Sequence, residues 1–247
     1  MRCFTVNHKE MFDIIRKKTL VHSKLFNGFT DFHSHLLPGV DDGIETIQET
    51  VEILDFYQDL GVKEVIFTPH IMEDYPENNA NFLRNRFNEF QKIYTGKIKL
   101  SLGAEYMLDS CFEQHLDSDN LLTIRERQVL VETSYVYAPM NFYDLLNKII
   151  SKGYYVVLAH PERYSYMKKA DYDRLKQMGI RFQLNILSLT SYYGKGTKNT
   201  SQKILEMGYY NYLGSDMHNL HRFYEEIMQT KFSIKIINAM KEIICHT

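Results

Sequence analysis

The sequence has few of the residues that stabilise small secreted folds. Its 247 residues include 3 cysteines, 5 prolines and no tryptophan. Cys3, Cys111 and Cys245 are far apart and form no Cys-x-x-Cys pair, which argues against a disulfide framework and against a thiolate zinc site. This cysteine usage fits a reducing compartment best.

Long apolar runs and an excess of charge of one sign are also missing. No window approaches the roughly 18 apolar residues of a membrane span, and residues 1–28 contain no apolar stretch long enough for a secretory signal. The 29 Lys and Arg residues are balanced by 31 Asp and Glu residues, which argues against binding nucleic acid through its phosphates. We therefore expect a cytoplasmic protein with no nucleic-acid partner and no direct membrane insertion. A small anionic substrate stays open.

What the sequence does contain is a repeated unit, a short apolar run followed by a segment of helical periodicity. The predicted strands span residues 29–33, 64–69, 98–104, 128–133, 155–159, 181–185 and 210–214. The predicted helices span residues 45–60, 79–94, 142–152, 171–178, 200–207 and 221–242. In the first helix, Ile47, Val51 and Leu54 mark the expected apolar face. This α/β alternation favours a closed or nearly closed parallel barrel, with an open doubly wound sheet as the alternative.

The composition of the sequence gives no sign of a domain boundary after the N-terminal segment. No linker, charge block or low-complexity tract divides the repeated units, so we expect one domain over residues 29–247. Residues 1–28 lie outside the pattern and are predicted to be an N-terminal extension, either a short helix near Glu10–Lys18 or a mobile arm.

Half of the ten histidines come directly after predicted strands. They are His33, His35, His70, His160 and His218. Carboxylates stand at the same strand ends: Asp31, Asp41, Asp42, Glu105, Glu132 and Asp216. Because the carboxyl ends of the strands in a parallel barrel open onto one face, these side chains are expected to converge there.

The spacing of these residues favours a metal site. Side chains alternate along a strand with period two, so His33 and His35 point to the same side, and Asp216 and His218 repeat that spacing. Each pair alone is a weak signal, but the joint pattern is hard to explain by packing or capping. Imidazole and carboxylate donors without thiolate suit manganese, iron or zinc. Such ions lower the pKa of a bound water and neutralise charge on the oxygens of a phosphate ester.

Two arginines follow the predicted ligands and supply a cation for phosphate. Arg163 comes three residues after His160, and Arg222 comes four residues after His218. A guanidinium matches phosphoryl oxygens in bidentate geometry, although a salt bridge to a neighbouring carboxylate is the simpler alternative for each.

A thiol mechanism of phosphate transfer is excluded by position. It requires an arginine six residues after the cysteine, where this chain has Lys9 after Cys3 and Asp117 after Cys111 and ends after Cys245. The sequence also contains no Gly-x-Ser-x-Gly elbow and no Walker-type loop.

The motifs together resemble those of the PHP (polymerase and histidinol phosphatase) superfamily. The matching segments are Thr30-Asp31-Phe32-His33-Ser34-His35, Val40-Asp41-Asp42-Gly43, Thr68-Pro69-His70, Gly103-Ala104-Glu105, Ala159-His160-Pro161-Glu162-Arg163-Tyr164 and Ser215-Asp216-Met217-His218-Asn219. Within the superfamily they look most like the bacterial manganese-dependent tyrosine-protein phosphatases of capsule and exopolysaccharide synthesis. The similarity runs from about residue 29 to about residue 222.

The resemblance implies a distorted (β/α)7 barrel with three divalent metal ions, manganese first and iron or zinc as alternatives. The implied metal ligands are His33, His35, Asp42, His70, Glu105, His160, Asp216 and His218, with Glu105 bridging two ions. Arg163 matches a phosphate-binding arginine of the family, and Arg222 lies near the position of a second one.

The implied function is a metal-dependent hydrolase that removes phosphate from phosphotyrosine. In the family, the substrate is the tail of a membrane-bound tyrosine autokinase that controls polysaccharide synthesis. A small-molecule phosphatase, such as one for histidinol phosphate, shares the metal motifs and is the first alternative. The second is a non-catalytic metal-binding scaffold that docks a kinase. Homo-oligomerisation is left open.

Overall fold

Strands and helices alternate along residues 17–247, the part of the chain that the computed structural model describes. The strands are β1 (Thr30–Ser34), β2 (Glu64–Phe67), β3 (His70–Ile71), β4 (Lys99–Leu102), β5 (Glu105–Met107), β6 (Gln128–Glu132), β7 (Tyr155–Ala159), β8 (Arg181–Asn185) and β9 (Tyr210–Gly214). The helices are α2 (Ile47–Leu60), α3 (Ala80–Ile93), α4 (Phe112–Asp117), α5 (Phe142–Ser151), α6 (Lys169–Gln177), α7 (Gly194–Glu206), α8 (Leu220–Gln229) and α9 (Ile234–Cys245). The short 3-10 helices η1 (Pro161–Arg163) and η2 (Ile186–Leu189) follow β7 and β8. The α/β class is confirmed.

All pairings between these strands are parallel, and they form two sheets. One has the order β1-β2-β4 and the other the order β3-β5-β6-β7-β8-β9. The sheets are joined because β2 runs on into β3, and β4 into β5. Hydrogen bonds cross this junction, from Gly103 N to Phe67 O at 2.8 Å and from Glu105 N to Pro69 O at 3.1 Å. The predicted strands 64–69 and 98–104 thus correspond to β2 and β4, and the short strands β3 and β5 that continue them were not predicted.

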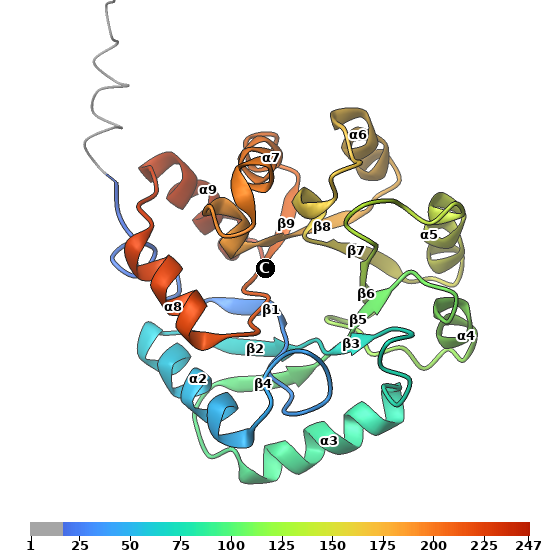
Figure 1. The fold of residues 1–247 in the computed structure, drawn as a ribbon, viewed down its shortest axis with the longest axis horizontal. Helices are drawn as coiled ribbons and strands as arrows, with labels where there is room; N and C mark the ends of the chain where they lie inside the picture. The colour runs from blue at the N-terminus through green and yellow to red at the C-terminus, as the bar shows by residue number, and fades with distance from the viewer. Residues whose placement is uncertain (1–16) are drawn as a thin grey trace, which may run out of the picture.

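The first and last strands lie side by side. Asp216 N donates to His33 O at 2.8 Å, and His35 N donates to Met217 O at 3.1 Å. The buried Asp31 carboxylate accepts hydrogen bonds from Ser215 N and Ser215 Oγ at 2.8 and 2.6 Å. The strands thus follow one another around a ring with the helices outside it (Figure 1), which agrees with the predicted distorted barrel.

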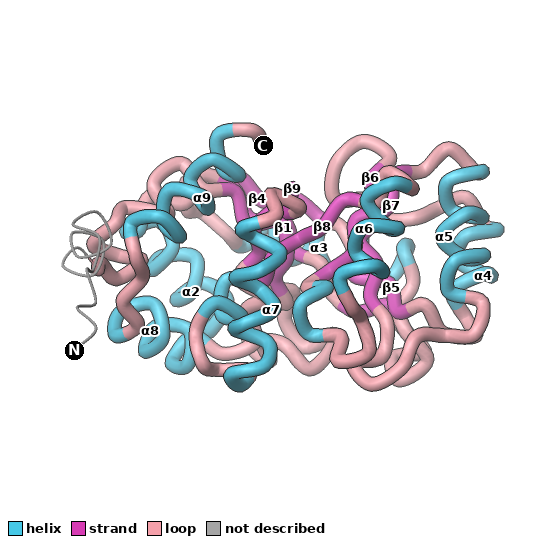
Figure 2. Tube along the Cα trace, turned by 90° about the horizontal axis from the view of Figure 1, so that it is seen from above, coloured by secondary structure: helices cyan, strands magenta, loops and turns pink. Residues whose placement is uncertain are grey.

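Apolar side chains fill the ring as well as the space around it. A small buried cluster separate from the main core draws on strands from several sides of the ring: Phe32, Ile66, Ile124, Leu130, Val157, Ala159 and Tyr212. The main core lies between the strands and the surrounding helices, with α4 and α5 at one end of the molecule and α8 and α9 at the other (Figure 2). The strand ends above the inner cluster are thereby held on a packed base.

Helix α2 forms where predicted, but it buries a different face. Its start is fixed by a capping box between Thr46 and Glu49, and its end by Gly61 at φ 86°. The buried side chains are those of Thr50, Ile53, Leu54 and Tyr57, whereas Ile47 is 37% exposed. The expected face of Ile47, Val51 and Leu54 was therefore wrong by part of a turn, because polar bonds orient the helix: Tyr57 donates to Asp31 Oδ2 and Thr50 donates to Leu36 O.

The predicted helix 221–242 is two helices. Thr230 ends α8, and Ser233 caps α9 by accepting a hydrogen bond from Ile236 N. Between them Phe232 is buried and pairs with Lys18, with bonds of 3.0 and 2.9 Å in both directions. Helix α4 was not predicted, and α7 begins six residues earlier than expected, at Gly194.

The described part of the predicted N-terminal extension packs against the domain. Leu20, Leu25 and Phe26 are at most 1% exposed. The expected helix Glu10–Lys18 falls almost wholly outside the described residues, and the boundary at residue 28 stays a prediction. No helix in residues 17–247 is long and apolar enough to cross a bilayer.

Candidate metal centre

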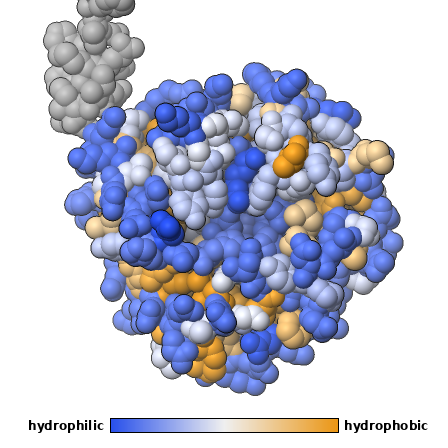
Figure 3. Space-filling view, in the orientation of Figure 1, coloured by the Kyte–Doolittle hydropathy of each residue, from blue (hydrophilic) through white to orange (hydrophobic). Residues whose placement is uncertain are grey.

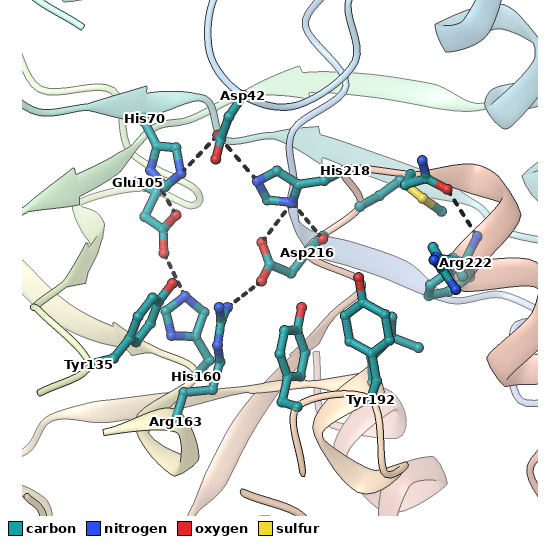
Figure 4. A pocket seen from close by; sticks show the side chains of 15 residues that line it. Asp42, His70, Glu105, Tyr135, His160, Arg163, Tyr192, Asp216, His218 and Arg222 are labelled. Atoms are coloured by element: carbon teal, nitrogen blue, oxygen red, sulfur yellow. Dashed lines mark hydrogen bonds and ion pairs between the residues drawn. The ribbon is translucent and has the colours of Figure 1, made fainter. Parts of the chain in front are cut away.

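The predicted ligands meet at the carboxyl ends of the strands. β1 supplies His33 and is followed by His35, β3 begins with His70, β5 begins with Glu105, and β7 is followed by His160. Asp216 and His218 follow β9, and Asp42 comes from the loop after β1. Figure 3 shows hydrophilic residues at the centre of this face, and Figure 4 shows the side chains of Asp42, His70, Glu105, His160, Asp216 and His218 turned toward one another.

Four buried atoms form the tightest group. His33 Nε2 lies 3.1 Å from His35 Nε2. Glu105 Oε2 is 3.1 and 3.4 Å from these two nitrogens, and Asp216 Oδ1 is 3.4 Å from each. A divalent ion about 2.0–2.2 Å from tetrahedral ligands would hold them roughly 3.3–3.6 Å apart. The distance between the two imidazole nitrogens and their distances to each carboxylate oxygen are therefore close to those of ligands on one ion.

Neighbouring side chains fix the two imidazoles of this group. His33 Nδ1 lies 2.9 Å from Gln183 Oε1, and His35 Nδ1 lies 2.8 Å from Asp41 Oδ2. Each partner accepts a hydrogen bond from Nδ1, so Nε2 is the ring nitrogen that faces the centre. Although burial acts in the opposite direction, His35 lowers the pKa of Asp41 to about 2, which keeps this partner charged.

A second group lies closer to solvent. Asp42 Oδ1 is 3.4 Å from His70 Nε2 and 3.5 Å from His218 Nε2. The rings of His35 and His218 stack with centroids 4.0 Å apart. Donor atoms of His35, Asp42, His70 and His218 all lie within 4.8 Å of one another.

A third group uses Glu105 again. His70 Nδ1 lies 3.2 Å from Glu105 Oε2 and 3.1 Å from Glu132 Oε1. The other oxygen of Glu105, Oε1, is 3.0 Å from His160 Nε2. The two oxygens of one carboxylate thus face different imidazoles, an arrangement suited to bridging two ions.

The chemistry of the cluster fits cations. Within the described residues, the buried atoms Glu105 Oε2 and His70 Nδ1 have no hydrogen-bond partner, and unpaired buried polar atoms are rare in folded proteins. Burial acts against charge on both Glu105 and His33, yet His33 holds the pKa of Glu105 well below its usual range, and Glu105 and Asp216 raise the pKa of His33 to about 9. The donor set is nitrogen and oxygen only, which suits manganese, iron or zinc.

Backbone geometry at the site is specialised. His160 and Asp216 have φ values of 30° and 52°, a left-handed conformation that is costly for residues other than glycine. A Cβ atom at Gly214 would stand 2.5 Å from His33 Cβ, so only glycine allows β9 to approach β1 here. β1 also has one residue more than β2 between the pairs Asp31–Val65 and Ser34–Phe67, a bulge that re-aims the side chains that follow.

The two predicted arginines have different surroundings. Arg163 Nη1 donates to Asp216 Oδ2 at 2.8 Å, so the carboxylate that it pairs with belongs to one of the predicted ligands. Arg222 lines the same cavity from α8, but its side chain is 65% exposed, and its nearest carboxylate is Glu225 at 3.9 Å. Only Arg163 is held in place.

A cavity of about 280 Å³ opens above the cluster. Its walls include Tyr135, Tyr192 and Tyr193, with Arg163 and Arg222 also facing it. Tyr106 and Tyr164 are at most 2% exposed and fill space in the core. The cavity has room for a phosphate and part of an aromatic ring.

Sequence reasoning left several contributing residues without a role. Glu132 and Asp41 were noted at strand ends but were not assigned, although Glu132 contacts His70 and Asp41 orients His35. Gln183 and Asn185 were missed, because amides in a predicted strand are not typical metal ligands. Two amides at alternate positions of the predicted strand 181–185 were the available signal.

Comparisons with known proteins agree on one family. Residues 29–238 match the family model described as "Capsular polysaccharide synthesis, CpsB/CapC". Tyrosine-protein phosphatase CpsB of Streptococcus pneumoniae is 30% identical over 205 residues, covering 77% of this chain and 83% of that protein. Tyrosine-protein phosphatase YwqE of Bacillus subtilis is 27% identical over 196 residues, covering 77% of each chain.

A solved structure supports the fold. It comes from work on YwqE of Bacillus subtilis and CpsB of Streptococcus pneumoniae, described there as metal-dependent tyrosine phosphatases. It superposes with a TM-score of 0.74 and 22% identity, covering 89% of this chain and 95% of the other.

Proposed function

The chain belongs to the CpsB/CapC family of capsular polysaccharide synthesis, and on that basis we propose that it is a metal-dependent phosphomonoesterase acting on phosphotyrosine in proteins. The observation that carries the proposal is the buried cluster of imidazoles and carboxylates beside an immobilised arginine. The relatives named as tyrosine-protein phosphatases point to the same reaction class.

The proposed metal ligands are the eight residues predicted from the sequence, together with Glu132. His33, His35, Glu105 and Asp216 would hold one ion, and the groups around His218 and around Glu132 would hold two more. Manganese is the first choice, with iron or zinc as alternatives. Such ions, when bound, supply an acidic water and positive charge for the phosphoryl oxygens.

The residues of the chain divide the remaining work. Gln183 and Asp41 keep the lone pairs of His33 and His35 turned inward. Arg163 presents its remaining N–H groups to the cavity and would bind two phosphoryl oxygens. Arg222 at the rim is the proposed second phosphate contact. The leaving phenolate, with a pKa of about 10, needs only modest help from an acid.

The proposed substrate is a phosphotyrosine-containing tail of a membrane-bound tyrosine autokinase that controls capsule synthesis, reached from the cytoplasm. The rim of the cavity supports a protein substrate, because Tyr135 and Tyr192 are 40% and 44% exposed there and leave room for a flanking chain.

Activity on para-nitrophenyl phosphate with added manganese, with and without a chelator, tests the reaction. We expect turnover that chelation abolishes and that His35→Ala removes. His246→Ala is the matched control and should leave turnover unchanged, because this exposed histidine at the end of α9 belongs neither to the cluster nor to the walls of its cavity. Activity that resists chelation would contradict the metal mechanism.

Substrate comparison separates the alternatives. A phosphotyrosyl peptide should be hydrolysed with a higher kcat/KM than histidinol phosphate. The reverse order would favour a small-molecule phosphatase. Stoichiometric metal content without hydrolysis of any ester would favour a non-catalytic scaffold.

A further inference from the structure

The guanidinium of Arg163 lies between two phenol rings. Its Cζ atom is 4.3 Å from the ring centroid of Tyr135 and 4.3 Å from that of Tyr193. Tyr135 follows β6, and Tyr193 precedes α7, so rings from two distant segments contact one planar cation. A cation in this position is attracted by the negative faces of both rings.

The edge of the same guanidinium is only partly used. Nη1 donates to Asp216 Oδ2, and no other acceptor in residues 17–247 pairs with the side chain of Arg163. A guanidinium carries five N–H donors in one plane. The unused donors can therefore meet a ligand in that plane, on the side that lines the cavity (Figure 4).

Tyr193 is tied to the metal cluster through Asn185. Asn185 Nδ2 donates to Asp216 Oδ2 at 2.8 Å and to Tyr193 Oη at 3.2 Å. The orientation of this amide is fixed, because its Oδ1 accepts a hydrogen bond from Leu187 N at 2.9 Å. Tyr193, Asp216 and Arg163 therefore share one anchor.

Tyr135 is held through its main chain. Its carbonyl accepts hydrogen bonds from Ser165 N and Ser165 Oγ at 3.0 and 2.9 Å, which ties its loop to the segment just after Arg163. Behind it, the ring stacks on Tyr164 with centroids 6.2 Å apart.

We propose that Tyr135 and Tyr193 are positioning residues that hold Arg163 in the orientation in which it binds the phosphoryl group. We call Arg163 and these two rings the arginine clamp. The ring faces that contact Arg163 are not available to stack on the phenol of the substrate. Tyr192, with a ring 44% exposed beside the clamp, remains available for that contact. This inference rests on the proposed function.

Replacing each tyrosine by leucine and by phenylalanine tests the clamp. Leucine removes the ring face, so Tyr135→Leu and Tyr193→Leu should raise the inhibition constant of inorganic phosphate and the KM of phosphotyrosine about tenfold, with metal content unchanged. Phenylalanine keeps the ring face, so both phenylalanine variants should stay within about threefold of wild type. Tyr155→Leu is the matched control, because Tyr155 also pairs with an arginine, Arg181, but at the start of β7 and away from the site.

Coupling to Arg163 separates positioning from general packing. In an Arg163→Ala background, the leucine substitutions should change the phosphate constant by less than twofold, because the rings act through the missing guanidinium. Equal effects with and without Arg163, or leucine variants that bind phosphate as wild type does, would overturn the inference.

Failure of the proposed function has a different signature. If the wild-type protein hydrolyses no ester, the phosphatase proposal fails. Calorimetric titration of the manganese-loaded protein with inorganic phosphate then still tests the roles of Tyr135 and Tyr193. The leucine variants should bind phosphate about tenfold more weakly than wild type, and the phenylalanine variants should stay within about threefold.

Discussion

A glutamate is buried at each end of the strands, and the two glutamates have different partners. At the amino-terminal end, Glu64 on β2 accepts hydrogen bonds from Arg125 at 3.1 and 2.7 Å and from Ser101 at 2.9 Å, and it pairs with Lys99 at 3.1 Å. At the carboxyl end, Glu105 is surrounded by imidazoles, and one of its oxygens has no hydrogen-bond partner in the described chain.

This difference separates structure from function. The chain itself satisfies the charge of Glu64, because its hydrogen bonds and ion pairs offset the cost of burying that charge. The charges around Glu105 are incompletely matched by protein groups, which is costly unless a ligand completes them. Buried carboxylates of the first kind should affect unfolding, and those of the second kind should affect metal binding and turnover.

The largest effect should come from Glu105→Gln. An amide cannot supply the bridging charge, so we expect metal content to fall and kcat/KM to drop by about 1,000-fold or more. Metal analysis and turnover of para-nitrophenyl phosphate measure both. A variant that kept its metal content and its kcat/KM would contradict the proposed difference between Glu105 and Glu64.

Arg163→Ala should lower kcat/KM by about 100- to 1,000-fold, the usual cost of removing one transition-state donor. Arg163→Lys should recover only part of this loss, because an ammonium lacks the bidentate fork. Arg222→Ala, which removes an exposed side chain, should have a much smaller effect. Equal losses from the two alanine variants would contradict the difference in their surroundings.

Gln183→Leu should weaken metal binding by about 10- to 100-fold, because His33 then loses the acceptor that fixes its ring. Competition with a chelator of known affinity measures the change. Gln128→Leu, which removes another buried glutamine from the opposite strand end, is the control and should leave metal affinity unchanged.

Raising the pH should destabilise the metal-free protein and should increase the affinity of the protein for metal. Glu105 and Asp216 outweigh burial and raise the pKa of His33 from 6.5 to about 9 in the metal-free protein. The pairing of protonated His33 with these two carboxylates therefore stabilises the metal-free fold fully below about pH 6.5. That stabilisation is lost as the pH rises through about 9. Metal binding must displace that proton, so affinity should rise over the same interval, by about tenfold per pH unit for each proton displaced. Thermal melts in chelator and metal titrations at pH 6.5, 7.5 and 8.5 would reveal the two trends.

The smallest effect on turnover should come from Glu64→Gln. The substitution weakens the ion pair between Glu64 and Arg125 at the amino-terminal end of the strands, and the charge of Arg125 is then less well compensated. We therefore expect a loss of about 1–3 kcal/mol in the free energy of unfolding. Metal content and kcat should not change. Denaturant melts check the first expectation, and loss of metal in the folded variant would contradict the second.

The sequence predicted the convergence of the histidines and carboxylates better than it predicted the helices. The histidines and carboxylates were found because parallel strands end on one face, a rule that needs only the strand positions. The face of α2 and the break between α8 and α9 depend on tertiary partners, the Asp31–Tyr57 bond and the pairing of Phe232 with Lys18. Local periodicity cannot reveal such partners.

The same limit explains the missed amides and the uncertain arginine. Gln183 and Asn185 act only through His33 and Asp216, which are far from them in the chain. Arg222 has a sequence position close to a ligand, but the turn of α8 leaves it at the rim. Proximity in sequence does not fix the direction of a side chain.

The pairing of β1 with β9 also bears on how the protein is made. Asp31 and Ser215, which join these strands, stand 184 residues apart. The tightest group of donors takes His33 from the first strand, His35 from the residue after it, and Asp216 from the segment after the last strand. During synthesis, that group cannot exist until nearly the whole chain has emerged and the ring has closed, a slow, long-range step in folding. Loading of the proposed metal ions would therefore be a late event, and an interrupted chain ending before β9 would lack Asp216 and His218 to bind them.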